Sequence, residues 1–295
     1  MIESRVMETE APSDLLHVAL VGPESNGKST LGSTAPGVKL FLDYDQKAQV
    51  LAGKKNVYCI TIKNSGPSYN IQGAAEEILD VMSGLEKSLD LFNLTDTKGT
   101  KLFPQVPEGT IVKNLFHDSM ASMGKLFMDY ELSANGDLRR EIKIKDKLTV
   151  YLPKGFDSWN AEMKSVESVI MRSFALPINV FCLFHEQAEE TADSTVEKPK
   201  YTGRVIMFPV RYKTLLAKYF TDTWRVKLTY VNGKYEPRVY PLPDYSHDNA
   251  TSMKLDAVEE PDIAAMIAKH KSRITPQVSA SQGPKVVAGL ALTKK

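Results

Sequence analysis

The sequence predicts an α/β fold with a doubly wound, mainly parallel sheet, and three observations favour it. Apolar runs of strand length alternate with amphipathic segments of helix length along most of the 295 residues. A glycine-rich loop follows the first apolar run, at 15–21, and a short helical stretch comes directly after the loop. Late in the chain, residues 222–240 have the pattern of a C-terminal β-hairpin, because Asn232 and Gly233 are typical turn residues between two strands.

The first half of the chain contains four apolar runs that we expect to be strands. Runs without polar alternation are typical of parallel strands that are buried on both faces. The four runs lie at 15–21, 38–45, 56–62 and 111–119. Segments with apolar residues at helical spacing follow or separate these runs, at 28–35, 71–92 and 120–132.

The second half has fewer regular elements and more polar sequence. Residues 133–157 are polar and charged, and residues 185–204 are polar as well. Between these two stretches we expect an amphipathic helix at about 158–174 and an apolar strand at 178–184. A further helix, at 212–220, is expected to precede the hairpin.

We expect one folded domain with a tail at each end. Residues 1–13 form the N-terminal tail and residues 14–245 form the domain. Residues 246–295 have low hydrophobicity and scattered charge, which predicts a largely flexible C-terminal tail. One helix is expected in this tail, directly after Pro261.

The composition favours a cytoplasmic protein with no membrane segment. Hydrophobic residues make up 42% of the chain and charged residues 25%, which is ordinary for a soluble globular protein. Cys59 and Cys182 lie in apolar, strand-like runs, so we expect buried free thiols and a reducing compartment. No apolar run approaches the about 20 residues of a membrane span. The net charge of +1 excludes a global basic field, so any nucleic-acid binding must come from local patches.

The loop after the first strand has the spacing of a phosphate-binding loop. Gly22, Gly27, Lys28 and Ser29 fit the pattern G-x-x-x-x-G-K-[ST]. In such a loop the glycines let backbone N–H groups surround the phosphates, the lysine reaches the terminal phosphates and the hydroxyl can ligate Mg²⁺. The sequence therefore predicts a site for a nucleoside triphosphate, formed by Gly22, Pro23, Glu24, Ser25, Asn26, Gly27, Lys28, Ser29 and Thr30.

The interior of this loop, "GPESNGKST", closely resembles the phosphate loop of the RecA family of recombination ATPases, in which Pro and Glu follow the first glycine. Three further segments resemble RecA motifs in the same order along the chain. "FLDYD" is similar to the strand end that carries the acid for the attacking water, at Asp45, and "LFHDS" is similar to the Walker B strand end, at Asp118. "FCLFHE" resembles the strand that ends in a γ-phosphate sensor, at His185. The resemblance covers about residues 15–240, and its overall shape looks most like small phage RecA-core ATPases, a group of nucleotide-binding or single-strand-annealing proteins.

The resemblance implies an ATPase site with ATP and Mg²⁺ as ligands. Lys28 would stabilise charge on the transferring phosphoryl group, Ser29 and Asp118 would hold Mg²⁺, Asp45 would orient or deprotonate water, and His185 would sense the γ-phosphate. Two alternatives stay open, since Asp45 could belong to a strand-end turn and His185 could be a surface histidine.

This sequence differs from the family pattern at two places. The family usually has Glu where Asp45 stands, and Asp is one methylene shorter. A Walker B strand is normally apolar throughout, whereas here Lys113 and Asn114 lie inside the run that ends at Asp118.

The resemblance also implies a channel for single-stranded DNA, lined by the loops after the Walker B helix and after the sensor strand. The first of these loops, 133–157, is basic and has aromatic residues nearby, and the second, 186–204, becomes basic in its last part. Cations for phosphates and aromatic rings for stacking are what sequence-tolerant single-strand binding requires. The candidate DNA-binding residues are Arg139, Arg140, Lys143, Lys145, Lys147, Lys198, Lys200 and Arg204.

RecA-like enzymes usually complete the ATPase site with a cation from the neighbouring subunit of a ring or filament. The candidates here are Arg225 and Lys227, which could instead be outward-facing charges on a strand. The resemblance therefore implies a homo-oligomer.

We expect an ATP-hydrolysing protein of DNA recombination that binds single-stranded DNA and promotes annealing or strand exchange, in the cytoplasm of the host cell if it is phage-encoded. A nucleotide or small-molecule kinase would share the phosphate loop but should carry paired arginines near an acceptor pocket, and Arg139 and Arg140 are the only adjacent arginines. A nucleotide-gated assembly factor with slow hydrolysis is the other alternative. The end of the chain, "PKVVAGLALTKK", is either a disordered tail or a segment that docks a partner protein.

Overall fold

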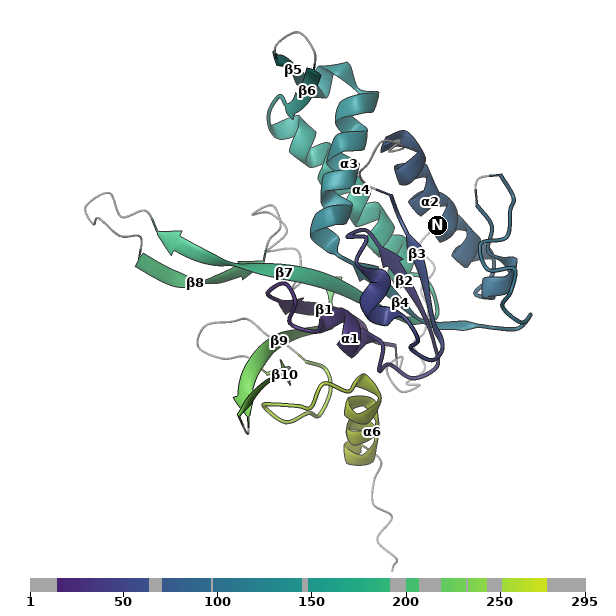
Figure 1. Cartoon of the computed structure of the whole chain (residues 1–295), viewed down its shortest axis with the longest axis vertical. Helices are drawn as coiled ribbons and strands as arrows, with labels where there is room; N and C mark the ends of the chain where they lie inside the picture. The colour runs from purple at the N-terminus through teal and green to yellow at the C-terminus, as the bar shows by residue number, and fades with distance from the viewer. Residues whose placement is uncertain are drawn as a thin grey trace, which may run out of the picture.

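The computed structural model describes residues 15–63, 71–96, 98–144, 148–191, 200–206, 219–231, 233–242 and 251–274, and for 144, 148, 187–191 and 200–206 it describes the backbone alone. These residues form an α/β fold (Figure 1). Of the helix expected at 212–220, residues 212–218 lie outside the described part of the chain.

A mostly parallel, mixed sheet lies at the centre of the molecule (Figure 1). Its strands are β1 (His17–Gly22), β2 (Val38–Asp43), β3 (Val57–Thr61), β4 (Val112–Asp118), β7 (Asn179–Thr191), β8 (Lys200–Ile206), β9 (Asp222–Val231) and β10 (Lys234–Tyr240). They are arranged in the order β10-β9-β1-β7-β4-β2-β3, and β8 pairs with β7. All neighbours from β9 to β3 run parallel, whereas β10 is antiparallel to β9 and β8 is antiparallel to β7. The hairpin expected near the C-terminus is thus the pair β9 and β10.

Helices cover both faces of this sheet, as a doubly wound arrangement requires. One face carries α2 (Ile71–Lys87), α3 (Met120–Ala134) and α4 (Phe156–Phe174). The other face carries the short helix α1 (Lys28–Gly32), the 3-10 turn η1 (Ala48–Leu51) and α6 (Ile263–Ile274). The expectation of a mainly parallel α/β sheet is therefore confirmed.

The strands are buried because successive side chains point into two separate cores. On β2, Leu40 and Leu42 pack into the core under α2, α3 and α4, while Phe41 packs into the core under α1. Phe41 stacks on Phe116 of β4 at 4.3 Å between ring centroids, and Phe116 stacks on Phe181 of β7 at 4.6 Å. This row of rings gives α1 a rigid apolar floor next to the phosphate loop.

The two polar residues inside β4 are accommodated in different ways. Asn114 is fully buried, donates a hydrogen bond to the Pro36 carbonyl at 2.6 Å and accepts one from Asn179 at 3.0 Å. Lys113 is exposed at the surface. The departure from an all-apolar Walker B strand is therefore accommodated without an unpaired buried amide.

The helix expected at 71–92 ends earlier, at Lys87. Asp90 lies at the start of the 3-10 turn η2 (Leu91–Asn93), where its carboxylate accepts hydrogen bonds from the backbone N–H groups of Phe92 and Gly109. These bonds fix a turn in which the apolar spacing continues although the helix does not.

Both polar stretches of the second half contain strands rather than simple loops. Residues 133–157 include the 3-10 turn η3 (Gly136–Leu138) and the two-stranded sheet of β5 (Arg139–Ile144) and β6 (Leu148–Pro153), which lies beyond the far ends of α3 and α4 (Figure 1). The strand expected to end at Phe184 continues as β7 to Thr191 and pairs with β8. Figure 1 shows these two strands projecting from the sheet.

The chain after the hairpin is more ordered than we expected. Met253, Leu255, Ile263 and Met266 are buried in the core under α1, so residues 251–274 pack on the domain instead of forming a flexible tail. The helix expected after Pro261 is α6, and its first backbone N–H donates a hydrogen bond to Thr34 Oγ1 at 2.8 Å. Residues 243–250 and 275–295 lie outside the described part, as does the segment that we considered for partner docking.

Candidate active site

The phosphate loop connects the carboxyl end of β1 to α1, and its two glycines are required by the backbone. A Cβ atom on Gly22 would lie 2.2 Å from the Val226 carbonyl oxygen of the neighbouring strand β9, so no larger residue fits there. Gly27 has φ +83°, a left-handed conformation that side chains disfavour. Helix α1 begins directly after it, at Lys28. These positions explain the glycine spacing of the motif in structural terms.

The strand order brings four distant segments together at the phosphate loop. Because β7 lies between β1 and β4, the parallel register places His185 opposite Gly22. On the other side, Asp118 at the end of β4 lies opposite Asp43 at the end of β2. The carboxyl ends of all four strands therefore meet at one edge of the sheet.

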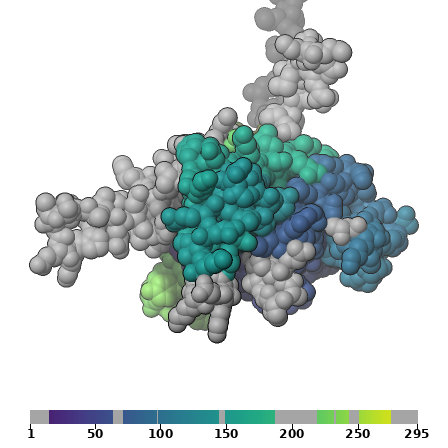
Figure 2. All heavy atoms as spheres, turned by 90° about the horizontal axis from the view of Figure 1, so that it is seen from above, coloured from purple at the N-terminus to yellow at the C-terminus, as the bar shows by residue number. Residues whose placement is uncertain are grey.

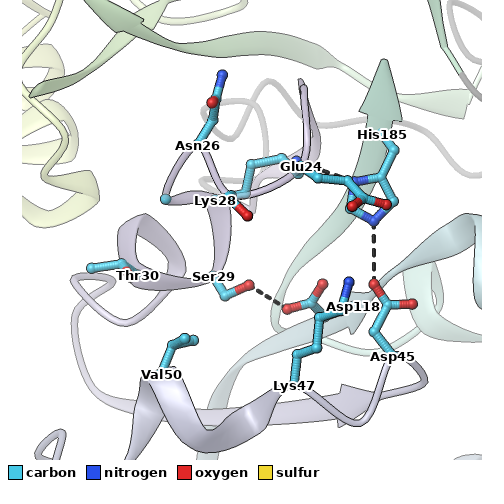
Figure 3. Close-up of a pocket in the computed structure, with 12 residues that line it drawn as sticks. Glu24, Asn26, Lys28, Ser29, Thr30, Asp45, Lys47, Val50, Asp118 and His185 are labelled. Carbon is cyan, nitrogen blue, oxygen red and sulfur yellow. Dashed lines mark hydrogen bonds and ion pairs between the residues drawn. The ribbon is translucent and has the colours of Figure 1, made fainter. Parts of the chain in front are cut away.

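A cavity of about 260 Å³ lies at this edge (Figure 3). Four predicted catalytic residues line it, namely Lys28, Asp45, Asp118 and His185. The rest of its lining comprises six loop and helix residues predicted to bind the nucleotide and two residues that we did not predict, as follows: Glu24, Ser25, Asn26, Gly27, Ser29, Thr30, Lys47 and Val50. The predicted Gly22 and Pro23 lie outside this lining and contribute their carbonyl groups to the base of the loop.

Lys28 is buried beneath the loop. Its ammonium group donates hydrogen bonds to the carbonyl oxygens of Gly22 and Pro23, each at 2.7 Å, and lies 3.4 Å from Nδ1 of His185. Burial lowers the pKa of Lys28 to about 8, against the opposing effect of Asp118 and other nearby carboxylates. The lysine thus carries a charge that is only partly compensated by the protein, which favours an anionic ligand.

Ser29 and Asp118 form a pair of oxygen ligands at the floor of the cavity. The Ser29 hydroxyl donates a hydrogen bond of 2.5 Å to Asp118 Oδ2 (Figure 3). Burial raises the pKa of Asp118 to about 6, although the bond from Ser29 and the charge of Lys28 oppose this. A hydroxyl and a carboxylate are hard oxygen donors of the kind that Mg²⁺ prefers.

Asp45 is held by three donors. Its Oδ2 lies 3.2 Å from His185 Nε2 (Figure 3), and its Oδ1 accepts hydrogen bonds from Ser119, at 2.9 Å, and from Ser122. Burial raises the pKa of Asp45, but the hydrogen bonds, above all that from His185, outweigh burial and lower it to about 2. Asp45 is therefore a firmly ionised carboxylate.

The turn that carries Asp45 is fixed by another acid. The Asp43 carboxylate, which is buried, accepts hydrogen bonds from the backbone N–H groups of Lys47, at 3.1 Å, and Ala48, at 2.9 Å. Of the two acids in "FLDYD", Asp43 thus shapes the turn and Asp45 enters the cavity. Residues two apart on a strand share a face, so the sequence pattern does not by itself distinguish the roles of Asp43 and Asp45.

A buried polar chain lies behind the cavity. The Tyr44 hydroxyl lies 2.9 Å from His117 Nδ1, and His117 Nε2 lies 2.9 Å from the Ser173 hydroxyl on α4. Burial lowers the pKa of His117 to about 4, so its ring is neutral. This chain links β2, β4 and α4 and does not reach the cavity surface.

The two residues predicted to act on a neighbouring subunit have partners within their own chain. The Arg225 guanidinium is buried and forms an ion pair with Glu186, at 3.0 Å from its Nε to Glu186 Oε1. The Lys227 ammonium lies 3.9 Å from the centre of the Tyr240 ring. Buried pairing of this kind ties the Arg225 guanidinium to the sheet of its own chain, and a role toward a neighbouring subunit stays a prediction.

The predicted DNA-binding residues whose side chains the structure describes fall into two groups. Arg140 and Lys143 are exposed on β5, whereas Arg139 is turned inward, donates to the carbonyl oxygens of Leu132 and Ser133 and pairs with Glu141. Large aromatic side chains are exposed near this hairpin, namely Tyr151, Phe156 and Trp159. Lys145, Lys147 and Lys198 lie outside the described residues, and for Lys200 and Arg204 the structure describes the backbone alone.

The described residues contain neither a cluster of metal-ligating side chains nor a membrane-crossing helix. No group of three or more His, Cys, Asp or Glu side chains suited to a metal ion occurs among them. In the same part of the chain, none of the helices combines the length and the apolar character that a membrane crossing requires. A site that holds Mg²⁺ with one carboxylate, one hydroxyl and phosphate oxygens needs no such cluster.

Comparison with models of known protein families gave no match for this chain, and comparison with curated proteins gave none either.

Proposed function

We propose that this protein is a RecA-like ATPase that binds ATP with Mg²⁺, hydrolyses it, and uses this cycle to bind single-stranded DNA in recombination, by annealing or strand exchange. The observation that carries the proposal is the convergence of Lys28, Ser29, Asp118 and Asp45 in one cavity at the carboxyl edge of the sheet. Phosphoryl transfer requires positioned cations and an oriented water more than covalent chemistry, and these residues supply both.

The phosphate loop would hold the triphosphate through backbone N–H groups that precede α1. Helix α1 has only five residues, so the loop amides and the Lys28 ammonium contribute more than a helix dipole. On binding, the ammonium of Lys28 would exchange its contacts with the Gly22 and Pro23 carbonyls for phosphate oxygens. The negative charge of the phosphates would oppose the effect of burial that lowers the pKa of Lys28.

The residues present fit a magnesium ion. The Ser29 hydroxyl and the Asp118 carboxylate lie side by side and share a hydrogen bond, so the hydroxyl could ligate Mg²⁺ directly while Asp118 holds it through a water molecule. A bound Mg²⁺ would neutralise phosphate charge during transfer. The charge of the ion would also offset the free-energy cost of burying the ionised Asp118 carboxylate.

Asp45 is suited to orient the attacking water rather than to take its proton. A carboxylate with a pKa of about 2 is a weak base at neutral pH, and Asp45 is held by His185, Ser119 and Ser122. His185 also lies 3.4 Å from Lys28, so it contacts both the phosphate-binding lysine and the water-orienting acid. This position suits the predicted sensor of the γ-phosphate.

The proposed DNA surface lies at the other end of α3. Arg140 and Lys143 on β5 are exposed beside Phe156 and Trp159 at the start of α4, which offers phosphate contacts and stacking surfaces. Figure 2 shows this teal part of the chain at the surface seen from above. Helix α3 starts two residues after Asp118 and spans 15 residues, so a rigid rod of about 22 Å joins the two sites.

Two other functions share the phosphate loop. For a kinase, Arg139 and Arg140 would have to reach the cavity, but both lie on β5, and the lining of the cavity includes no arginine among the described residues. A nucleotide-gated assembly factor is favoured by one observation, since the low pKa of Asp45 suits slow hydrolysis. A homo-oligomer is part of the proposal.

ATP hydrolysis by the full chain, measured with and without single-stranded DNA at two ionic strengths, tests this function. The proposal expects stimulation by DNA that decreases steeply with salt, because phosphate contacts release counterions. Saturable ATP binding with no turnover under either condition would support the assembly factor instead, and phosphoryl transfer to a small acceptor would support a kinase.

A further inference from the structure

The cavity contains more negative than positive side chains, although its proposed ligand is an anion. Its lining includes the carboxylates of Glu24, Asp45 and Asp118 and the ammonium groups of Lys28 and Lys47. The bound Mg²⁺ of the proposed function leaves a triphosphate with excess negative charge. A second positioned cation is therefore required at the phosphates, and Arg225 is unsuited because it pairs with Glu186.

Lys47 is held at the cavity by its backbone. Its N–H donates a hydrogen bond to Asp43 Oδ1 at 3.1 Å, and the next N–H, of Ala48, donates to Asp43 Oδ2 at 2.9 Å. Thr61 on β3 lies 3.5 Å from the same carboxylate, so three elements fix the turn. The side chain itself is exposed to solvent and keeps the freedom to follow a ligand.

The Lys47 ammonium forms no hydrogen bond or ion pair within the described chain. Figure 3 shows its side chain rising beside Asp118 and Asp45, while Thr30 and Val50 lie on the opposite side of the cavity. The phosphate loop and the Asp45–His185 pair mark the end of the cavity for the terminal phosphate. Lys47 is therefore at the γ-phosphate end, and the nucleoside would lie toward Thr30 and Val50.

We propose that Lys47 is a catalytic cation supplied by the same chain, which contacts the γ-phosphate and stabilises the charge that develops during transfer. The inference rests on the proposed ATPase function. In the reaction a water oxygen bonds to the γ-phosphorus, the bond from this phosphorus to the β–γ bridging oxygen breaks with its electron pair left on ADP, and the water proton passes to the released phosphate or solvent. Lys47 neither donates nor accepts a proton in this step.

Three variants of the full chain test this role. Lys47→Met removes the charge and keeps the length, Lys47→Arg keeps the charge, and Lys54→Met removes a matched exposed charge that is not part of the cavity lining. The measurements are the affinities for ADP and for ATPγS with magnesium, and the kcat and KM of ATP hydrolysis. Thermal unfolding of each variant reports whether the fold is intact.

We expect Lys47→Met to lower kcat about 100-fold and the affinity for ATPγS about tenfold. The affinity for ADP should change less than twofold, because only the γ-phosphate contacts the lysine. Lys47→Arg should restore most of the loss, and Lys54→Met should behave as wild type. Equal loss of ADP and ATPγS affinity, or unchanged kcat and affinities in Lys47→Met, would overturn the role of Lys47 and leave the ATPase proposal intact. Failure of the wild type to bind ATPγS with magnesium and to hydrolyse ATP would overturn both.

Discussion

The two ends of helix α3 use their polar residues in opposite ways. At its start, Ser119 and Ser122 bond to Asp45, and Asp118 bonds to Ser29, so the side chains are ordered before any ligand is present. At its far end, cations and aromatic rings of the β5–β6 hairpin and α4 are exposed. The proposed nucleotide site is therefore built by the fold, whereas the proposed DNA surface depends on side chains that the fold leaves exposed to solvent.

The largest expected effect is a loss of ATP turnover without a loss of folding, at the start of α3, where the side chains are ordered. Lys28→Ala should reduce ATP turnover about 1,000-fold, because the ammonium stabilises charge that develops in the transition state. Steady-state hydrolysis measures this, with Lys54→Ala as a control that leaves the cavity unchanged and thermal unfolding as a check on the fold. Turnover within threefold of wild type would show that the ordered end is not the site of hydrolysis.

The next effect concerns a cation that we assign to stability rather than to catalysis. Arg225→Met should lower the free energy of unfolding by about 3–5 kcal/mol, because the buried Glu186 carboxylate would lose its ion pair with Arg225. The double variant Arg225→Met, Glu186→Leu should recover part of this loss. Urea unfolding measures both variants. A stable Arg225→Met protein that loses only its concentration-dependent ATPase would instead support a role toward a neighbouring subunit.

A third prediction lies between the two ends, where α4 packs on α3. Burial raises the pKa of Glu162 from 4.5 to about 7, the charge of Asp129 adds to this, and Glu162 Oε2 has no hydrogen-bond partner within the described residues. Because the folded-state pKa is raised, stability is lost as pH rises from about 4.5 through about 7.

Glu162→Gln should therefore stabilise the protein at pH 8 by about 2–3 kcal/mol, since one pKa unit corresponds to about 1.4 kcal/mol, and should have little effect at pH 4.5. Urea unfolding at the two pH values tests this, with the exposed Glu141→Gln as control. A difference between variant and wild type that does not change with pH would contradict the assignment.

A smaller effect is expected at the exposed end. Trp159→Ala should weaken the binding of single-stranded DNA by about 1–3 kcal/mol because base stacking on the ring is lost, while the affinity for ATP stays unchanged. Tyr230→Ala removes an exposed aromatic ring from the β9–β10 hairpin and serves as the matched control. Fluorescence anisotropy with a labelled oligonucleotide provides the measurement. Equal weakening by both variants would remove the reason for placing DNA at this end.

The smallest effect compares two neighbouring arginines. Arg140→Gln should reduce the slope of log affinity for DNA against log salt by about one, because an exposed cation can neutralise one phosphate. Arg139→Gln should leave the slope unchanged, since Arg139 is bonded to Leu132, Ser133 and Glu141. Titrations at several salt concentrations distinguish them, and identical slopes for both variants would contradict the difference.

Most of the sheet and the ordered site could be predicted from sequence because both follow from local patterns. Buried parallel strands are recognised in the sequence as apolar runs. Lys28 was identified by the spacing of the phosphate loop, whereas Asp118 and His185 were identified by the resemblance to RecA motifs. Asp118 and His185 lie near each other because the carboxyl ends of parallel strands meet at one edge of the sheet. Lys47 was missed because its importance comes from the turn that Asp43 fixes, and that turn carries no sequence motif.

The remaining differences come from long-range pairing that a local pattern does not contain. From the sequence, Arg225 is a candidate cation for a neighbouring subunit or an outward-facing charge. The local pattern does not show that β7 continues past Phe184 and places Glu186 beside it. Residues 251–274 read as a tail because their average hydrophobicity is low, yet four apolar side chains in them reach the core, and Asp222 accepts hydrogen bonds from Thr251 and Ser252. The average hydrophobicity of a segment does not indicate whether a few apolar residues are placed so that they reach the core.

Equilibrium titration of the full chain with ATP and magnesium tests whether the phosphate loop, Lys28 and the Ser29–Asp118 pair act as one nucleotide site. We predict saturable binding of one ATP per chain that requires Mg²⁺ and is lost in Lys28→Ala while the variant remains folded. Binding that does not saturate, or that is equally strong in folded Lys28→Ala, would contradict the account.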